Sequence, residues 1–156
     1  MLDMFLYNWQ VREDWFKWCE SISQEELCKS RVGGMGSILK NLYHVVDCEQ
    51  LWINQLLGKS PMKTDINSIH SLEEVIEFSN LVRDVTENFL KLWNSASEEK
   101  LLIIQSKNGK TYNLTHGKVL RHIISHEIHH IGQLSIWSRE LGIKPVSSDL
   151  IIRDFT

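Results

Sequence analysis

The residues best suited to chemistry lie near the C-terminus, in the stretch HEIHHIGQL. Its first five letters fit the H-E-x-x-H pattern of zinc proteases, in which two histidines on one helix face hold the metal and the glutamate activates water. Those residues are His126, Glu127 and His130. The motif alone does not decide the chemistry, because any histidine-rich helix with one glutamate can match it. The origin of a third metal ligand decides it.

The sequence after this motif offers no suitable third ligand. A protease of the extended H-E-x-x-H-x-x-G-x-x-H type needs glycine and a further histidine where this chain has Gln133 and Ile136. Glu140 is the only glutamate after the motif, and it lies on the same predicted helix. A third ligand must therefore come from upstream, which is not the order found in zinc proteases.

Three histidines, His122, His126 and His130, recur every four residues and therefore share one face of the predicted helix. That face also carries apolar residues, so the imidazoles need partners if they are buried. The four-residue spacing is one that metal-binding histidines use, and we expect His126 and His130 to be metal ligands. His122 suits a structural role or the support of a ligand better than ligation, and His129 points to one side.

His44 is the best upstream candidate for a third ligand. It lies off the apolar stripe of its own predicted helix, beside Cys48 and Leu51. The residues alone leave open whether it is on the surface or in the site. His70 and His116 lie next to predicted helix starts, where an exposed or capping role is expected.

Four long helices must position these histidines. Apolar spacing, capping signals and breakers predict helices at about residues 2–20, 37–57, 71–92 and 115–141. Such helices, joined by modest connections, predict an all-α fold built as a four-helix bundle.

Two smaller elements are also predicted. Ser23 begins a short helix that the glycine cluster Gly33–Gly36 ends, and this cluster forms a turn before the next helix. The dipeptide Asn108-Gly109 separates two strand-like runs, which predicts a hairpin over Leu101–Leu114, just before the last long helix. Because two strands alone are marginally stable, we expect this hairpin to lean on the helices.

The composition is that of an ordinary globular protein. The chain has 156 residues, 42% of them hydrophobic and 24% charged, which suits one domain over residues 1–156. A net charge of −3 with scattered lysines and arginines disfavours nucleic acid as a partner. The N-terminus lacks the features of a signal peptide, and no segment approaches the roughly 20 apolar residues of a membrane span, so we expect a cytoplasmic protein without a membrane partner. The cysteines, without CxxC spacing, should be reduced thiols.

Two segments resemble the DinB/YfiT-like family of metal-dependent proteins. The first is GSILKNLYHVVDCEQLW, with His44, Glu49 and Trp52 in an H-x-x-x-x-E-x-x-W arrangement. The second, and more specific, is VLRHIISHEIHHIGQL. The resemblance extends through nearly the whole chain and implies a four-helix bundle in which His44 joins His126 and His130 as a metal ligand. One difference is Ile131, where many relatives have arginine, and we expect it to alter a local surface contact.

The resemblance also implies an activity. Related proteins include S-transferases and isomerases that use low-molecular-weight thiols such as bacillithiol or mycothiol, so a thiol S-transferase is the leading hypothesis. Its partners would be such a thiol and a small electrophilic substrate, and family likeness suggests a homodimer. The cofactor would be a divalent metal ion, and imidazole ligation suits Zn²⁺, Ni²⁺ or Fe²⁺.

The roles of the neighbouring polar residues and the reaction itself stay open. Gln133, one turn beyond His130, could orient a ligand or the substrate. Glu127 could support a ligand or act as a hydrolytic base. Two rival functions are a metal-dependent hydrolase, in which bound water attacks, and a metal-binding dimeric module without catalysis.

Overall fold

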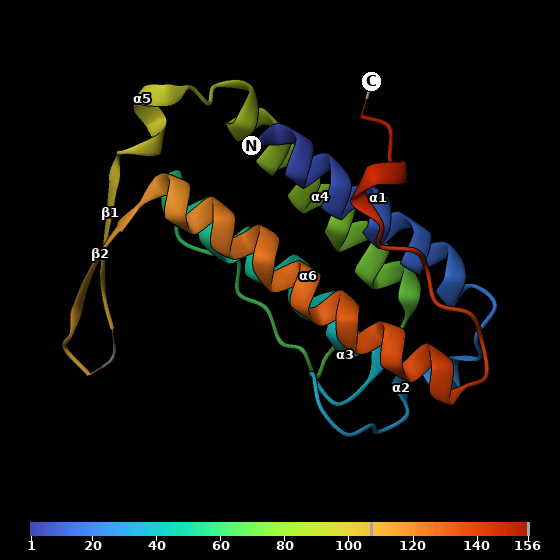
Figure 1. Ribbon diagram of the computed structural model, residues 1–156. Helices are drawn as coiled ribbons and strands as arrows, with labels where there is room; N and C mark the ends of the chain where they lie inside the picture. The colour runs from blue at the N-terminus through green and yellow to red at the C-terminus, as the bar shows by residue number, and fades with distance from the viewer. Residues whose placement is uncertain (107, 156) are drawn as a thin grey trace.

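The computed structural model describes residues 1–106 and 108–155, and within them four long helices run alongside one another (Figure 1). These helices are α1 (Leu2–Cys19), α3 (Ile38–Leu56), α4 (Leu72–Lys91) and α6 (His116–Glu140). The shorter elements are α2 (Gln24–Cys28), α5 (Ser95–Glu98), strands β1 (Leu101–Gln105) and β2 (Thr111–Thr115), and a 3-10 turn η1 (Leu150–Ile152). The predicted helical bundle with a small hairpin before the last long helix is therefore confirmed.

Local capping sets where the long helices begin. Ser37, Ser71 and Thr115 each accept a hydrogen bond from a backbone N–H in the first turn of α3, α4 and α6, respectively. At α4 the bond is reciprocal, because the Glu74 carboxylate returns to the N-cap backbone as in a capping box. The short helix α2 begins after Ser23 as predicted but ends at Cys28, well before the glycine cluster.

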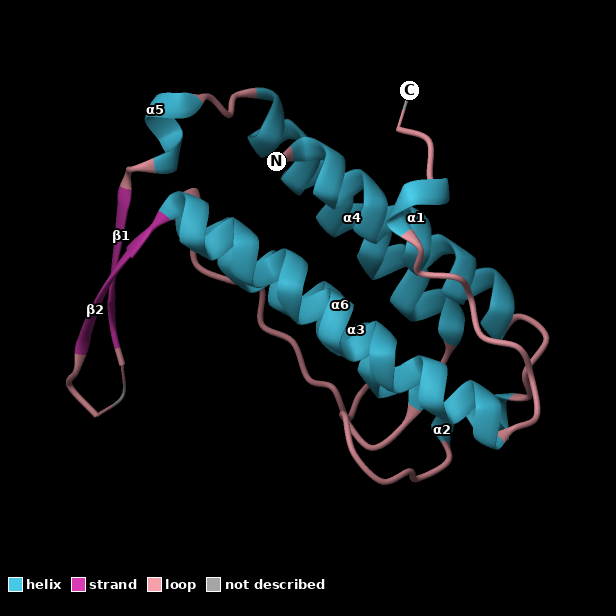
Figure 2. Ribbon diagram, in the orientation of Figure 1, coloured by secondary structure: helices cyan, strands magenta, loops and turns pink. Residues whose placement is uncertain are grey.

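The two helices that carry the histidine motifs are neighbours. Helix α3 packs against α4 and also against α6, and Figure 2 shows α3 lying behind α6 and running alongside it. One apolar cluster occupies the end of the bundle near Trp15, Leu39 and Trp137. A second cluster occupies the other end, around Trp9 and Ile123. The aromatic side chains of α1 lie in these two clusters.

A polar layer separates the two apolar clusters. The guanidinium group of Arg12, on α1, is fully buried and contacts two buried carboxylates. It donates hydrogen bonds to both oxygens of Glu127, at 2.8 and 2.7 Å, and to Glu49 at 2.6 Å. Trp9 also donates to Glu49, and Arg12 donates to the Ser79 hydroxyl on α4. This network joins all four long helices.

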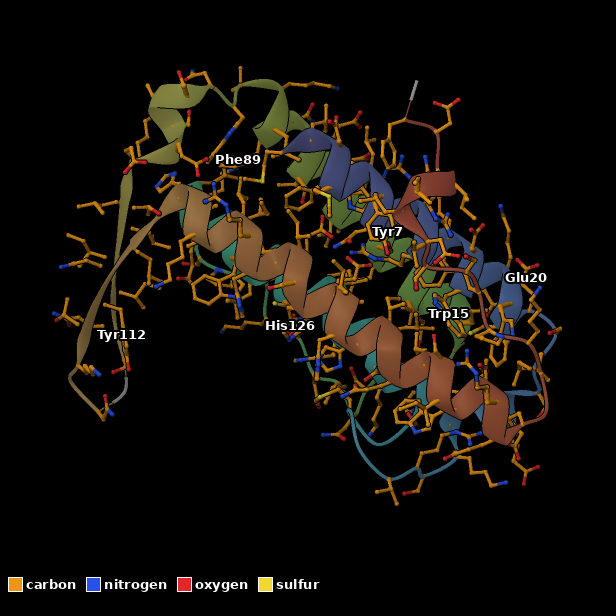
Figure 3. All side chains as sticks on the ribbon, in the orientation of Figure 1. Tyr7, Trp15, Glu20, Phe89, Tyr112 and His126 are labelled. Carbon is orange, nitrogen blue, oxygen red and sulfur yellow. The ribbon has the colours of Figure 1, made fainter. Side chains whose placement is uncertain are left out.

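The hairpin stands out from one end of the bundle (Figures 1 and 2). Its strands pair antiparallel, with Leu102 opposite Leu114. These two side chains, at the base, pack against the neighbouring apolar cluster. The outer part does not lean on the helices as expected, because Ile103 and Tyr112 are exposed and Tyr112 lies well away from the bundle in Figure 3.

The remaining chain closes over α1. After α6 the C-terminal segment returns along this helix, where Tyr7 and Trp18 donate hydrogen bonds to the backbone carbonyls of Ser148 and Lys144. The three cysteines are free thiols, as predicted. Among the described residues, no helix combines the length and apolar character needed to cross a membrane.

Replacing Arg12 tests how far the bundle depends on the polar layer. We expect Arg12→Met to lower the free energy of unfolding by about 3–5 kcal/mol, because it leaves two buried carboxylates without a cation. Urea denaturation followed by circular dichroism measures this loss. The triple variant Arg12→Met/Glu49→Gln/Glu127→Gln should recover part of it. Arg121→Met is the matched control, because Arg121 pairs with Glu98 at the surface and its loss should cost less than about 1 kcal/mol. Equal losses in the two single variants would contradict this expectation.

Candidate metal centre

Three of the predicted histidines converge where α3 meets α6. His44 comes from α3, His126 and His130 come from α6, and their ligand atoms all lie within 4.8 Å of one another. The Nε2 atoms of His44 and His126 are 3.2 Å apart. Two nitrogens bound about 2.0–2.1 Å from one ion, at tetrahedral or octahedral angles, would lie about 2.9–3.4 Å apart. This pair therefore has the spacing of two ligands of a single ion.

The third histidine, His130, is held by two acceptors. Its Nδ1 atom lies 3.0 Å from the Asn41 side-chain oxygen and 2.7 Å from the Gln133 side-chain oxygen. Because both partners are acceptors, Nδ1 must carry the proton, which leaves the lone pair of Nε2 free for a metal ion. Hydrogen bonds of this kind fix the tautomer and orientation of metal-binding histidines. The structure thus places Gln133 against His130, as the sequence suggested.

Asn41 is a functional candidate that sequence reasoning missed. It is fully buried on α3, and its amide group also donates to the backbone carbonyl of His130 at 3.0 Å. Its oxygen accepts a further bond from the backbone N–H of Met35. Asn41 therefore fixes both the ring and the backbone of His130. A polar amide between Leu39 and Leu42, one turn before His44, was the available signal.

The glycine-rich loop before α3 lies directly against this support. A Cβ atom on Gly34 would fall 2.7 Å from the side-chain oxygens of both Asn41 and Gln133, and the residue has a positive φ of 51°. Only glycine avoids both problems. The loop also accepts a hydrogen bond from the Trp137 indole at the Val32 carbonyl. The loop thus forms the predicted turn and also packs against the two side chains that hold His130.

Burial keeps the three imidazoles in the form that binds metals. Desolvation, together with smaller contributions from the neighbouring histidines, lowers the pKa of His126 to about 4. Desolvation also lowers the pKa of His44 and of His130. All three rings are therefore neutral near pH 7, and a neutral imidazole is the ligand form. The donor set and spacing fit a divalent ion, while the individual ligand assignments stay a prediction.

The other histidines lie outside this cluster. His122 is exposed and stands one turn before His126, with ring centroids 5.6 Å apart. His129 is exposed and contacts Gln133. His70 is exposed just before the N-cap of α4, and His116 is the first residue of α6, so both lie at helix starts as expected.

Two residues of the motif have different surroundings from those expected. Glu127 is buried, and both of its carboxylate oxygens accept hydrogen bonds from Arg12. It belongs to the polar layer and is not free to take a proton from water. Ile131, which we expected to affect a surface contact, is buried in the apolar cluster near Trp137.

Single replacements of the clustered histidines test the site. We expect His44→Ala, His126→Ala and His130→Ala each to weaken Zn²⁺ binding more than about 100-fold, because each would remove a ligand, a larger loss than an outer partner causes. Isothermal titration and metal content after dialysis measure the effect. His70→Ala, a change of the same type at an exposed position, should bind normally. If His44→Ala and His130→Ala keep full metal content, this site is wrong.

Asn41→Ala tests the support of His130. It should weaken Zn²⁺ binding by about 10–100-fold, the usual effect of removing a group that orients a ligand. The exposed Asn88→Ala is the control. Titrations are made at a temperature where circular dichroism shows that both variants are folded, so that lost stability is not read as lost affinity. Unchanged affinity in folded Asn41→Ala would show that this amide does not support a ligand.

Comparison with known proteins gives the chain its family. Residues 1–154 match the profile of the DinB family. The "Uncharacterized protein YizA" of Bacillus subtilis (strain 168) is 40% identical over 153 residues, covering 98% of this chain and 95% of that protein. The crystal structure of a DinB-like protein from Bacillus cereus ATCC 10987 matches with a TM-score of 0.66 at 19% identity, over 92% of this chain and 94% of that one. The last likeness concerns the fold alone, but the family profile covers nearly every residue, and the chain therefore belongs to the DinB family.

Proposed function

We propose that this protein is a metal-dependent thiol S-transferase that joins a low-molecular-weight thiol of the bacillithiol type to a small electrophile. The observation that carries the proposal is the convergence of three neutral imidazoles from two helices. Three protein ligands leave at least one coordination position for a further molecule, which is the arrangement of catalytic sites. In a structural site, a fourth protein ligand would occupy that remaining coordination position.

The bound ion, Zn²⁺, Ni²⁺ or Fe²⁺, would supply Lewis acidity, which lowers the pKa of a thiol so that the thiolate is present near neutral pH. In the transfer, the sulfur forms a bond to the electrophilic carbon, and the bond from that carbon to its leaving group breaks. The leaving group departs with the bonding electrons, and the thiol proton passes to water. The chain's own residues hold this geometry: Asn41 and Gln133 keep the His130 ring oriented.

The surroundings of Glu127 favour transfer over hydrolysis. In a hydrolase of the H-E-x-x-H type, the glutamate next to the first histidine takes a proton from the attacking water. Here Arg12 occupies both oxygens of that carboxylate at 2.8 and 2.7 Å. A thiol needs no such base, because its pKa lies much closer to neutral pH than that of water.

Conjugation of bacillithiol with monochlorobimane tests the proposal. The zinc- or nickel-loaded protein should accelerate formation of the fluorescent conjugate. His44→Ala should lower the rate constant at least about 100-fold, because it removes a ligand of the ion that activates the thiol. His70→Ala should have no effect. Turnover of esters or amides without thiol would instead favour the hydrolase, and metal binding without any conjugation would favour a non-catalytic module.

A further inference from the structure

A cavity of about 210 Å³ lies beside the histidine cluster, toward the hairpin end of the bundle. Trp52 of α3 and Leu114 of β2 form two of its sides, and Lys118, Val119 and His122 of the first turns of α6 complete it. None of these residues belongs to the three-histidine cluster. The cavity is therefore a separate feature from the predicted metal site.

His122 forms the wall between this cavity and the cluster. Its ring packs edge-on against Trp52, with centroids 5.6 Å apart, and lies tilted against the His126 ring at the same centroid distance. Only one imidazole ring thus separates an occupant of the cavity from a predicted metal ligand. The cavity and the histidine cluster are therefore neighbours that share contact with the exposed His122.

The lining defines what the cavity can hold. The Trp52 ring and the Leu114 and Val119 side chains are apolar, so most of an occupant must be apolar too. Lys118 is the charged residue of the lining; it is exposed, and none of the ion pairs among the described residues includes it. An anionic substituent would find a free counter-charge there.

Size sets a further limit. A dry cavity of about 150 Å³ accommodates benzene, so the space here suits one ring with a short substituent. Bacillithiol carries a sugar and two carboxylates, and such a polar molecule does not match walls of tryptophan, leucine and valine. The cavity therefore fits the electrophile better than the thiol.

We propose that this cavity binds the body of the electrophilic substrate and selects a small aromatic or unsaturated molecule that carries one carboxylate. The carboxylate pairs with Lys118, the ring lies against Trp52, and the reactive carbon faces the metal centre past His122. This inference rests on the proposed transferase function, because it names the substrate class of that reaction. It is tested by binding, without thiol or turnover.

The probes are phenylacetate and its neutral isostere phenylacetamide, measured by ligand-observed NMR on metal-free and zinc-loaded protein. At low salt, phenylacetate should bind about two- to fivefold more tightly, the range expected for one partly exposed charge pair. The preference should persist without zinc, because it arises from Lys118 and not from the metal. Equal affinities of the two probes for the wild-type protein would overturn the proposal.

Matched variants test which residues cause the preference for phenylacetate. Lys118→Gln should remove the preference and leave phenylacetamide binding unchanged, whereas Lys63→Gln, at an exposed position in the loop after α3, should keep it. Trp52→Ala should weaken both probes at least about fivefold, as loss of an aromatic contact predicts. Trp52→Leu serves if that variant does not fold. A preference that survives in Lys118→Gln overturns the assignment.

A second measurement separates this inference from the transferase proposal. Conjugation of bacillithiol with 4-(chloromethyl)benzoate and 4-(chloromethyl)benzamide compares a charged with a neutral electrophile. If both react but Lys118→Gln and Trp52→Leu leave both KM values unchanged, the cavity assignment fails and the transferase stands. If neither reacts but the binding preference is found, the cavity assignment stands and the transferase fails.

Discussion

The buried contact of Arg12 with Glu49 and Glu127 is the constraint on which the rest of the structure depends. Each carboxylate belongs to a helix that carries the histidine cluster: Glu49 follows His44 on α3, and Glu127 follows His126 on α6. Burial alone would lower the pKa of the Arg12 guanidinium, but the charges of Glu127 and Glu49 raise it overall, so the cation stays charged. Desolvating three charges is costly, and the cost is offset only while the two helices keep the positions that let one guanidinium reach both carboxylates.

The position of this network along the bundle matters as much as its strength. On α6, the residues of one apolar cluster end at Ile124 and those of the other begin at Ile131. His126, Glu127 and His130 all lie in this interval, at the level where polar groups replace the apolar core. Apolar packing on both sides keeps the register of α3 against α6 and limits solvent access. The lowered pKa of His126 is one consequence of this environment.

The features that the sequence predicted are those that local patterns of residues determine. Helix starts at Ser37, Ser71 and Thr115 follow from capping within one turn. The i, i+4 pair of His126 and His130 follows from helix geometry. The placement of His44 beside this pair depends on how α3 packs on α6, and the residues alone left it undecided until the family resemblance favoured it. Asn41 was missed for the same reason, because its partner His130 lies on another helix.

Arg12 was also missed, although signals for it existed. It lies on α1 one turn before Trp15 and Phe16, both buried, so a charge falls on the apolar face of that helix. Glu49 interrupts the apolar face of α3 in the same way. A cation and an anion on the buried faces of two helices should meet, because neither can be left alone in the core. The hairpin shows the opposite limit: Asn108-Gly109 predicted that it forms, but nothing in the pattern indicated that only its base contacts the bundle.

The direction of side chains around α6 explains why H-E-x-x-H has a different meaning here. Consecutive residues on a helix point about 100° apart, so Glu127 cannot share the face of His126 and His130. In a protease that sideways direction brings the carboxylate to the metal-bound water. In this bundle α1 lies on that side, and Arg12 of α1 donates hydrogen bonds to both oxygens of Glu127. The same side-chain direction therefore buries the glutamate in the core. The helix packed beside α6 therefore decides which role the glutamate of the motif takes, and in this bundle that role is an ion pair in the core.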